Sequence, residues 1–365
     1  MEGMELKDFY KGKKVFITGH TGFKGAWLCE ILCELGAEVT GYALAPEESP
    51  SLFELLNIQK NPQINSIIGD IRDYTALSDA YKSAEPDIVF HLAAQPLVRE
   101  SYADPLYTYE TNVMGTANLL ECVRIFGAAS VVNITTDKVY LNNEWEWGYR
   151  ENEPLCGYDP YSNSKSCAEL VTYSYNNSYF KKEGIPVSTA RAGNVIGGGD
   201  FAKDRIVPDC VRAAQNKASL ELRNPYSTRP YQHVLEALFA YLLIARKQFE
   251  KPDLADCYNV GPDEHDCVTT GYLADVFCKA WNTHTGQGIV CKIAPEAADA
   301  PHEASFLKLD CSKIKTKLWW KPVYDINTAV IKTVEWSAGQ INGADARGLC
   351  KQQIKEYMED VQRNG

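Results

Sequence analysis

The sequence predicts an α/β fold, a doubly wound parallel sheet with helices on both faces and a second, smaller lobe. Short apolar strands alternate with helical patterns as far as about residue 190, which is typical of a parallel sheet. A glycine-rich turn follows the first strand, and beyond residue 191 the alternation ends in segments rich in glycine and proline. At roughly 150 residues per domain, the 365 residues are enough for two domains.

The elements of the sheet domain are expected in strict order. Each strand is a short run of β-branched, aromatic or aliphatic residues, and each helix shows apolar residues at helical spacing. Expected strands cover 14–18, 38–44, 65–68, 87–92, 130–134 and 186–190, and expected helices cover 26–35, 75–82, 105–126 and 161–182. Because strands that alternate with helices run parallel, we expect these strands in one sheet.

The second lobe is expected where this alternation stops. The glycine run 197–199 interrupts the chain, and a helix near 233–248 and a short strand near 258–260 follow. We expect residues 1–190 to form the sheet domain, with about 230–260 returning to it. The smaller lobe would then consist of 191–229 and 261–365. Ligands of such folds bind in the cleft at the carboxyl ends of the strands.

Charge and composition exclude several classes of protein. The net charge is −11 and the isoelectric point is about 5.2, so we expect neither nucleic acid nor a membrane surface as a partner. The longest apolar run, 237–245, is far shorter than the roughly 20 residues of a membrane-spanning helix. The N-terminal segment lacks the pattern of an export signal, which makes the cytoplasm the expected location. The twelve cysteines and six histidines show no metal-binding spacing, so we expect reduced thiols and no metal.

The turn after the first strand has the spacing of a dinucleotide site. Glycines three residues apart let backbone N–H groups approach a pyrophosphate at the positive end of the following helix. The sequence does not continue with Gly-Lys-Ser/Thr, so it does not match a P-loop. The residues expected at the cofactor in this turn are Gly19, His20, Thr21, Gly22, Phe23, Lys24 and Gly25.

The acidic residue that usually binds the adenosine ribose, about 20 residues after the glycines, is missing. Residues 41–46 contain no arginine for a 2′-phosphate either, so NAD is preferred over NADP. Residues after the third and fourth strands would line the adenine and its ribose, although ordinary strand-end structure remains an alternative. These residues are Asp70, Ile71, Leu92, Ala93, Ala94 and Gln95.

Two polar groups could carry out chemistry. Tyr161 and Lys165 are four residues apart at the start of a helix and therefore share one face, where a cation favours the phenolate. Thr136, Asp137 and Lys138 directly follow the fifth strand and are expected at the cleft. The alternatives are a solvated helix face for the first group and a polar loop for the second.

Together these motifs resemble the nucleotide-sugar 4,6-dehydratases of the extended short-chain dehydrogenase/reductases, with the greatest similarity to the branch that acts on CDP-glucose. The resemblance covers about residues 10–340. It implies a Rossmann-type sheet, a smaller C-terminal substrate lobe, bound NAD and a CDP-glucose or similar nucleotide-sugar substrate. The segments that carry it are 19–25 (GHTGFKG), 91–99 (HLAAQPLVR), 136–138 (TDK) and 229–236 (RPYQHVLE).

The resemblance also implies roles for the polar groups. Tyr161, assisted by Lys165, takes the proton of the sugar 4-hydroxyl while a hydride moves to NAD, and Thr136 hydrogen-bonds the new ketone. Lys138 removes the carbon 5 proton, Asp137 protonates the departing 6-hydroxyl, and the hydride returns to carbon 6. Related dTDP-glucose enzymes have glutamate where Lys138 stands, so this position departs from their pattern.

An anionic substrate in an acidic protein requires local cations. Arginine suits a diphosphate because it binds oxygen pairs in a bidentate manner, and by resemblance Arg229 is the preferred candidate. Ordinary surface ion pairs remain the alternative for each arginine. The residues expected at the substrate are Arg191, Asn194, Arg205, Arg223, Arg229 and His233.

Two alternative functions are compatible with the same fold, and the long helices suggest an oligomer. A nucleotide-sugar 4-epimerase would need the glycine turn, Tyr161 and Lys165, but not the acid–base pair Asp137 and Lys138. A noncatalytic dinucleotide-sensing protein would need no phenolate. The expected helices 105–126 and 161–182 could pair with their copies in another subunit, as in related enzymes, which would give a homodimer or homotetramer.

Overall fold

The computed structural model describes residues 2–47, 49–222, 224–293 and 305–364. Its centre is a seven-stranded sheet in the order β11-β6-β5-β4-β1-β2-β3, and every neighbouring pair is parallel. The strands are β1 (Lys14–Thr18), β2 (Glu38–Ala43), β3 (Ile64–Ile68), β4 (Ile88–His91), β5 (Ser130–Ile134), β6 (Val187–Ala192) and β11 (Cys257–Val260). The prediction of a doubly wound parallel sheet is therefore confirmed.

The strand order reverses between β1 and β4. From β1 the chain builds outward through β2 to β3, and from β4 it builds in the opposite direction through β5 to β6. A crevice opens at such a switch point beyond the carboxyl ends of the strands. The glycine turn after β1 and the segment after β4 lie on either side of it.

Helices cover both faces of the sheet. Successive residues of a strand point alternately into the core on one face and the core on the other. Val15 and Ile17 of β1 belong to one core, and Phe16 between them belongs to the other. The first core also contains α1 (Glu2–Tyr10), α2 (Phe23–Glu34), α11 (Val234–Glu250) and α15 (Ala346–Asn364), and the second is covered by α4 (Tyr74–Ala84), α7 (Gly115–Phe126) and α8 (Pro160–Tyr175).

Two of the expected helices contain a wider turn. The expected helix 105–126 consists of α6 (Pro105–Tyr109), the π-helical turn η2 (Glu110–Met114) and α7. The expected helix 161–182 consists of α8, the π-helical turn η4 (Asn176–Phe180) and α9 (Lys181–Glu183). The remaining short elements of this half are α3 (Leu52–Leu55), α5 (Val98–Ala103), η1 (Ile58–Lys60) and η3 (Asp137–Val139).

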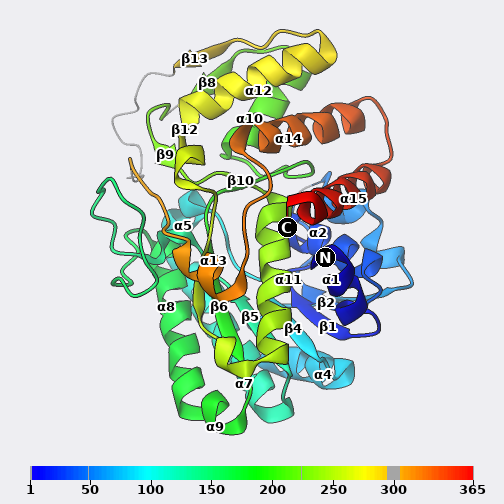
Figure 1. Ribbon diagram of the computed structural model, residues 1–365, viewed down its shortest axis with the longest axis vertical. Coiled ribbons are helices and arrows are strands. Elements are labelled where there is room, and N and C mark those ends of the chain that lie inside the picture. The colour runs from blue at the N-terminus through cyan, green and yellow to red at the C-terminus, as the bar shows by residue number, and fades with distance from the viewer. Residues whose placement is uncertain (1, 48, 223, 294–304, 365) are drawn as a thin grey trace.

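A smaller lobe lies at one end of the sheet (Figure 1). Its own apolar core joins α10 (Ile206–Gln215), α12 (Thr270–Thr285) and α14 (Ile326–Ile341). Short strand pairs complete it: β7 (Val195–Ile196) with β10 (Gln232–His233), β9 (Thr228–Arg229) with β12 (Val268–Thr269), and β8 (Leu220–Leu222) with β13 (Cys291–Ile293). The remaining short elements are η5 (Pro252–Leu254), which follows α11, and η6 (Glu264–Asp266) and α13 (Ser312–Leu318), which follow β11.

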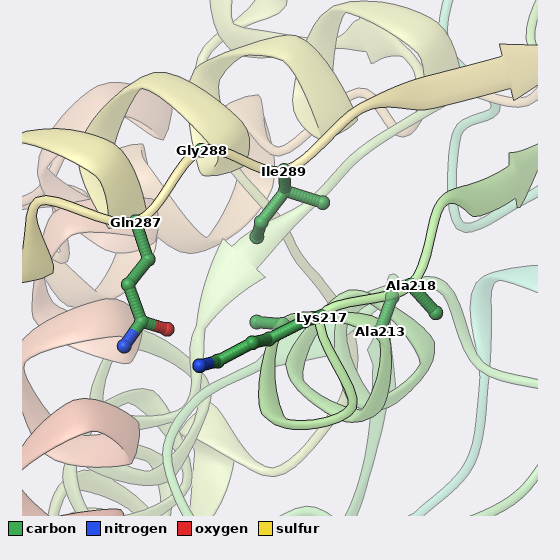
Figure 2. Close-up of a pocket in the computed structure, with 7 residues that line it drawn as sticks. Ala213, Lys217, Ala218, Gln287, Gly288 and Ile289 are labelled. Carbon is green, nitrogen blue, oxygen red and sulfur yellow. The ribbon is translucent and has the colours of Figure 1, made fainter.

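A pocket of about 270 Å³ opens in this lobe between the end of α10 and the segment before β13 (Figure 2). It is lined by Ala213, Ala214, Lys217, Ala218, Gln287, Gly288 and Ile289, none of which the sequence places at the functional site. Within the described part of the chain, no helix has both the length and the apolar character needed to cross a membrane.

Candidate active site

The glycine turn owes two of its glycines to the packing of the chain itself. Gly19 has a φ of +79°, and a Cβ there would lie 2.7 Å from the backbone nitrogen of Ala93. A Cβ on Gly25 would lie 2.7 Å from the Cα of His20 and still closer to the carbonyl oxygen of Gly19. These two positions bring α2 close to the sheet and the turn close to the segment after β4.

Gly22 has a different role. It precedes α2 with a φ of −76° and a ψ of 169°, and no side chain of the described residues caps the helix there. A Cβ on Gly22 would meet only the Gly19 carbonyl oxygen, at 3.5 Å, which is an ordinary contact. The missing side chain thus leaves the helix N-terminus open, and its backbone N–H groups suit a pyrophosphate.

His20 and Thr21 anchor this turn to neighbouring strands. His20 is buried, its Nε2 lies 2.8 Å from the Ser66 hydroxyl, and burial lowers its pKa to about 4, so the ring is neutral. Thr21 donates a hydrogen bond of 2.8 Å to the carbonyl oxygen of Leu44. His20 and Thr21 therefore hold the turn in place through contacts within the chain. Phe23 is the first residue of α2.

The residues expected around the adenine lie at the strand ends but make contacts within the chain. Asp70 forms an ion pair of 2.7 Å with Arg72, and Ile71 is buried against Gly115. Gln95 donates a hydrogen bond of 2.9 Å to the Thr108 hydroxyl, and its neighbours Leu92, Ala93 and Ala94 are half-buried. These residues therefore lie at the carboxyl ends of β3 and β4.

Asn112 is a residue that the sequence analysis missed. It lies in the π-helical turn η2, accepts a hydrogen bond of 2.8 Å from the Gln95 backbone and donates one of 2.8 Å to the Ser164 hydroxyl. It therefore ties the segment after β4 to α8. A π-turn often marks a functional position, but the sequence pattern of the helix does not reveal one.

Thr136, Asp137 and Lys138 lie at the carboxyl end of β5, where the sequence places them. Thr136 donates a hydrogen bond of 3.0 Å to Asp137 Oδ1 and accepts one of 3.4 Å from the Lys138 backbone. Asp137 is 2 % exposed, and its Oδ2 has no hydrogen-bond partner among the described residues. Burial raises the pKa of Asp137, while the charges of Lys138 and Arg229 oppose that rise. A raised carboxyl pKa favours the protonated form, which a proton donor requires.

Tyr161 and Lys165 are brought to the same place by α8. The side chain of Asp159 caps this helix by accepting a hydrogen bond of 2.9 Å from the Ser162 backbone. Thr136 acts on Tyr161 and lowers its pKa, and the Lys165 ammonium donates to the carbonyl oxygen of Ile134 at 3.2 Å. Lys165 is 5 % exposed, so the pair does not lie on a solvated helix face.

The electrostatics of this pair differ from the expectation. Burial raises the pKa of Tyr161 to about 12, and the effects that lower it come from Thr136 and Arg205 rather than from Lys165. The reason is that Lys165 is itself desolvated. Burial and the charge of Lys24 lower its pKa to about 7, so it is only partly charged near neutral pH.

Lys24 is a cation of the reaction centre as well as a turn residue. Its ammonium lies 5.8 Å from the ring centroid of Tyr241, and burial lowers its pKa to about 8. Its charge acts on Lys165, and the charge of Asp137 acts on Lys24 in turn. One signal could have indicated this role, because a lysine in the first turn of a helix opposes the helix dipole.

Arg191 and His233 are buried and make polar contacts within the chain. Arg191 is 3 % exposed, and its guanidinium is bound to Glu169 and to Tyr140. His233 is 0 % exposed, accepts a hydrogen bond from the Leu235 backbone, and has its pKa lowered to about 3 by burial. Both residues therefore lie in the packed interior, and the polar contacts described here are made within the chain.

Three of the other expected substrate residues lie on separate segments in the described part of the chain. Arg205 forms an ion pair of 3.0 Å with Asp200 directly before α10, and its charge lowers the pKa of Tyr161. Arg229, on β9, is 7 % exposed and lowers the pKa of Asp137. Asn194 lies between β6 and β7, and Arg223 lies outside the described residues. No cluster of three or more histidine, cysteine or acidic side chains in the described ranges could hold a metal ion.

The chain is similar to known nucleotide-sugar enzymes over most of its length. A family model described as GDP-mannose 4,6 dehydratase matches residues 16–333. A CDP-glucose 4,6-dehydratase of Salmonella typhimurium is 46% identical over 364 residues, which is 98% of this chain and 99% of that protein.

Solved structures show the same fold. An epimerase of Methanothermobacter thermautotrophicus superimposes with a TM-score of 0.79 at 21% identity, covering 94% of this chain and 97% of that one. A UDP-glucose 4-epimerase of Thermus thermophilus, in complex with NAD, gives a TM-score of 0.76 at 25% identity, with 89% and 99% covered.

Proposed function

Because the chain belongs to the GDP-mannose 4,6 dehydratase family, we propose that it converts CDP-D-glucose to CDP-4-dehydro-6-deoxy-D-glucose and water. The observation that carries this proposal is the identity of 46% with a CDP-glucose 4,6-dehydratase over 98% of the chain. The geometry of the site agrees with it, because an acid, a base and a phenol meet at the end of β5.

The cofactor of the proposal is NAD. The open N-terminus of α2 beyond Gly22 fits a pyrophosphate, and a related epimerase of the same fold carries NAD. When bound, NAD supplies a site that accepts a hydride from the sugar and returns it to the same sugar. Gly19 and Gly25 shape the turn that holds it, and Lys24 adds a cation beside it.

In the first half of the proposed reaction the chain moves a proton at the sugar 4-hydroxyl. Tyr161 accepts this proton, and Thr136, which lowers the pKa of Tyr161, orients the oxygen. Because burial raises the pKa of Tyr161 to about 12, the phenolate needs nearby positive charge; Arg205 supplies part of it, and the oxidised cofactor would add more.

In the second half the chain expels water across carbons 5 and 6. Lys138 takes the carbon 5 proton, whose acidity the 4-ketone has increased, and Asp137 protonates the leaving 6-hydroxyl. Lys138 then returns the proton to carbon 5 when carbon 6 receives the hydride. The buried carboxyl of Asp137 has a raised pKa, as a proton donor requires. A 4-epimerase has no need for this acid–base pair.

The substrate diphosphate requires cations at the mouth of the cleft. Arg229 is the preferred partner because its charge already reaches Asp137, so it lies close to the reacting sugar. Arg205 and Asn194 border the same cleft, and Arg205 also acts on Tyr161.

A deuterium label tests the proposal. The chain is incubated with NAD and CDP-glucose that carries deuterium on carbon 4, and the product is examined by NMR. We expect the deuterium in the new methyl group at carbon 6 and a 4-keto sugar that absorbs in alkali. A 4-epimer without a methyl group, or a label lost to solvent, would contradict the dehydratase assignment.

We further propose that two copies of the chain pair through α6, α7 and α8. Exposed apolar side chains gather on these helices and on the turn between α6 and α7: Leu106 is 75% exposed, Met114 56%, Leu170 53% and Tyr173 69%. Light scattering after gel filtration should show an oligomer for the natural chain and a monomer for Leu170→Glu. Ile331→Glu, on α14, is the matched control and should leave the mass unchanged.

We also propose that the protein works in the cytoplasm. Every described cysteine is free, as expected for a reducing compartment. Fractionation of cells that produce the chain should recover it in the cytoplasmic fraction.

A further inference from the structure

Helix α8 presents three polar side chains at intervals of four residues. Tyr161, Lys165 and Glu169 therefore lie on one face of the helix. The first two belong to the proposed reaction centre, and the third has no role in it so far. Glu169 is 4 % exposed, so its carboxylate has left water and requires partners.

The Glu169 carboxylate accepts four hydrogen bonds. Arg191 donates two of them as a bidentate pair, from Nε to Oε1 at 3.0 Å and from Nη2 to Oε2 at 2.9 Å. The hydroxyl of Thr135 donates to Oε1 at 2.5 Å, and the hydroxyl of Thr189 donates to Oε2 at 2.8 Å. Both oxygens are thus satisfied by fixed groups of β6 and of the segment after β5.

Arg191 extends this network away from the reaction centre. Its Nη1 donates to the Tyr140 hydroxyl and to the Glu151 carbonyl oxygen, both at 2.9 Å. Tyr140 in turn donates to Asn259 on β11 at 2.6 Å. The pair therefore joins α8 to two strands of the sheet and to the loop that follows η3.

Two consecutive residues at the carboxyl end of β5 are each held by a side chain of α8. Lys165 donates to the Ile134 carbonyl and Glu169 accepts from Thr135, and the next residue, Thr136, lowers the pKa of Tyr161. A buried ion pair is weak evidence for stability, because apolar residues of similar volume often stabilise a fold as well or better. The retained charges point instead to a role in geometry.

We propose that the buried pair of Glu169 and Arg191 is a positioning device that holds Thr136, Tyr161 and Lys165 in register for proton transfer at the sugar. This inference rests on the proposed dehydratase function. Neither residue touches substrate, and both act through Thr135 and the face of α8.

The charge of Glu169 also has a consequence for Lys165. Burial and the charge of Lys24 lower the pKa of Lys165 to about 7, and Glu169 opposes them. His91 is neutral, because burial lowers its pKa to about 3. Loss of the Glu169 charge would therefore lower the pKa of Lys165 further. The charged groups that act on Lys165 are Lys24 of α2 and Glu169 of α8. The charge of Lys165 acts on His91 of β4, Tyr161 shares its helix face, and Arg191 of β6 is paired with Glu169.

Two threonine variants test the positioning role. Thr135→Val and Thr189→Val each remove one hydroxyl from the same carboxylate and leave the ion pair intact. Their losses of stability should be similar. Thr135 alone adjoins Thr136, so Thr135→Val should lower kcat about tenfold at unchanged KM, and Thr189→Val should lower it much less. Equal kcat values for the two variants would overturn the proposal.

Charge variants test the effect on Lys165. With Glu169→Gln, the alkaline limb of the pH profile of kcat should move down by about one unit, because Arg191 remains unbalanced. The double variant Glu169→Gln/Arg191→Gln removes both charges and should shift the limb less. If both variants lose kcat equally with an unchanged profile, the pair is merely structural and the proposal fails. If the single variant does not fold, the double variant must still show reduced kcat at unchanged KM. A kcat of the double variant equal to that of the natural chain would overturn the proposal.

A readout without substrate separates this proposal from the proposed function. Competitive labelling with an amine-reactive anhydride, followed by mass spectrometry of the peptide that contains Lys165, measures the pKa of this lysine directly. The midpoint should fall in Glu169→Gln, and an unchanged midpoint would contradict the inference. If the natural chain fails to dehydrate CDP-glucose, the dehydratase assignment fails, while the labelling result still tests the effect of Glu169 on Lys165.

Discussion

Alanine at Gly22 and at Gly25 should have opposite effects, although both glycines belong to one turn. A Cβ on Gly25 would lie 2.7 Å from the His20 Cα and 2.9 Å from the Gly19 carbonyl carbon. These are backbone atoms that cannot rotate away, so α2 must move from the sheet. Overpacking of this kind costs about 1–3 kcal/mol, and contact with backbone favours the upper end.

The magnitude follows from the size of the chain. An unfolding entropy of about 2.1 cal/mol/K per residue gives about 0.8 kcal/mol/K for 365 residues. A loss of about 3 kcal/mol for Gly25→Ala therefore lowers Tm by about 4 °C. At Gly22 the φ of −76° suits alanine and the Cβ would meet only one atom, at 3.5 Å. Gly22→Ala should raise Tm by about 1 °C, because it restricts the unfolded chain.

The variant that keeps its stability, Gly22→Ala, should be the one that loses affinity for NAD. The Cβ of alanine at position 22 stands at the open N-terminus of α2, so Gly22→Ala should weaken NAD binding at least about tenfold, or about 1.4 kcal/mol. Isothermal titration calorimetry with NAD and differential scanning calorimetry of the free protein measure the two effects. Unweakened NAD binding by the stable Gly22→Ala variant would refute the assignment of this turn to the pyrophosphate.

Three further predictions concern the reaction centre. Tyr161→Phe should reduce turnover of CDP-glucose by about 10²–10⁴-fold and leave NAD affinity within a factor of two by calorimetry, and retained turnover would remove the phenol from the mechanism. The folded-state pKa of Asp137 is raised above 3.8, so its ionisation costs stability as the pH rises beyond that value. Asp137→Asn should therefore show a higher Tm than the natural chain at pH 7, no gain near pH 3 and a loss of product formation, and an unchanged Tm at pH 7 would contradict the burial argument. The folded-state pKa of Lys165 is about 7 against 10.5 in the unfolded chain, so stability should rise with pH between these values. Lys165→Met should raise Tm at pH 7, with the gain disappearing toward pH 10.5, and a gain independent of pH would show that the ammonium is not desolvated.

The order of strands and helices could be predicted because it depends on local patterns. The alternation of Val15, Phe16 and Ile17 between two cores is a property of the strand itself, and a strand of this kind repeats along the first half of the chain. The glycine turn was equally predictable, since a single short segment contains both the turn and the start of α2. The position of Thr136 and Tyr161 followed from their places after β5 and at the start of α8.

The polar interior was decided by tertiary contacts. Arg191 lies on β6 and reaches Glu169 on α8, and nothing in the pattern of a strand shows whether its arginine faces a cleft or a buried carboxylate. The same holds for His233, which packs against Trp27 far away in the sequence. Lys24 was recognised as a turn residue, but its charge acts on Lys165 only because the fold brings α2 and α8 together.

The sequence by itself determined the periodicity, the turn and the types of reactive side chain, because each of these depends on neighbours along the chain. Only the tertiary structure decided which charges lose water and which partners they find. Desolvation and hydrogen bonding depend on distances between segments that lie far apart in sequence, and these distances set the pKa of Asp137, Tyr161 and Lys165.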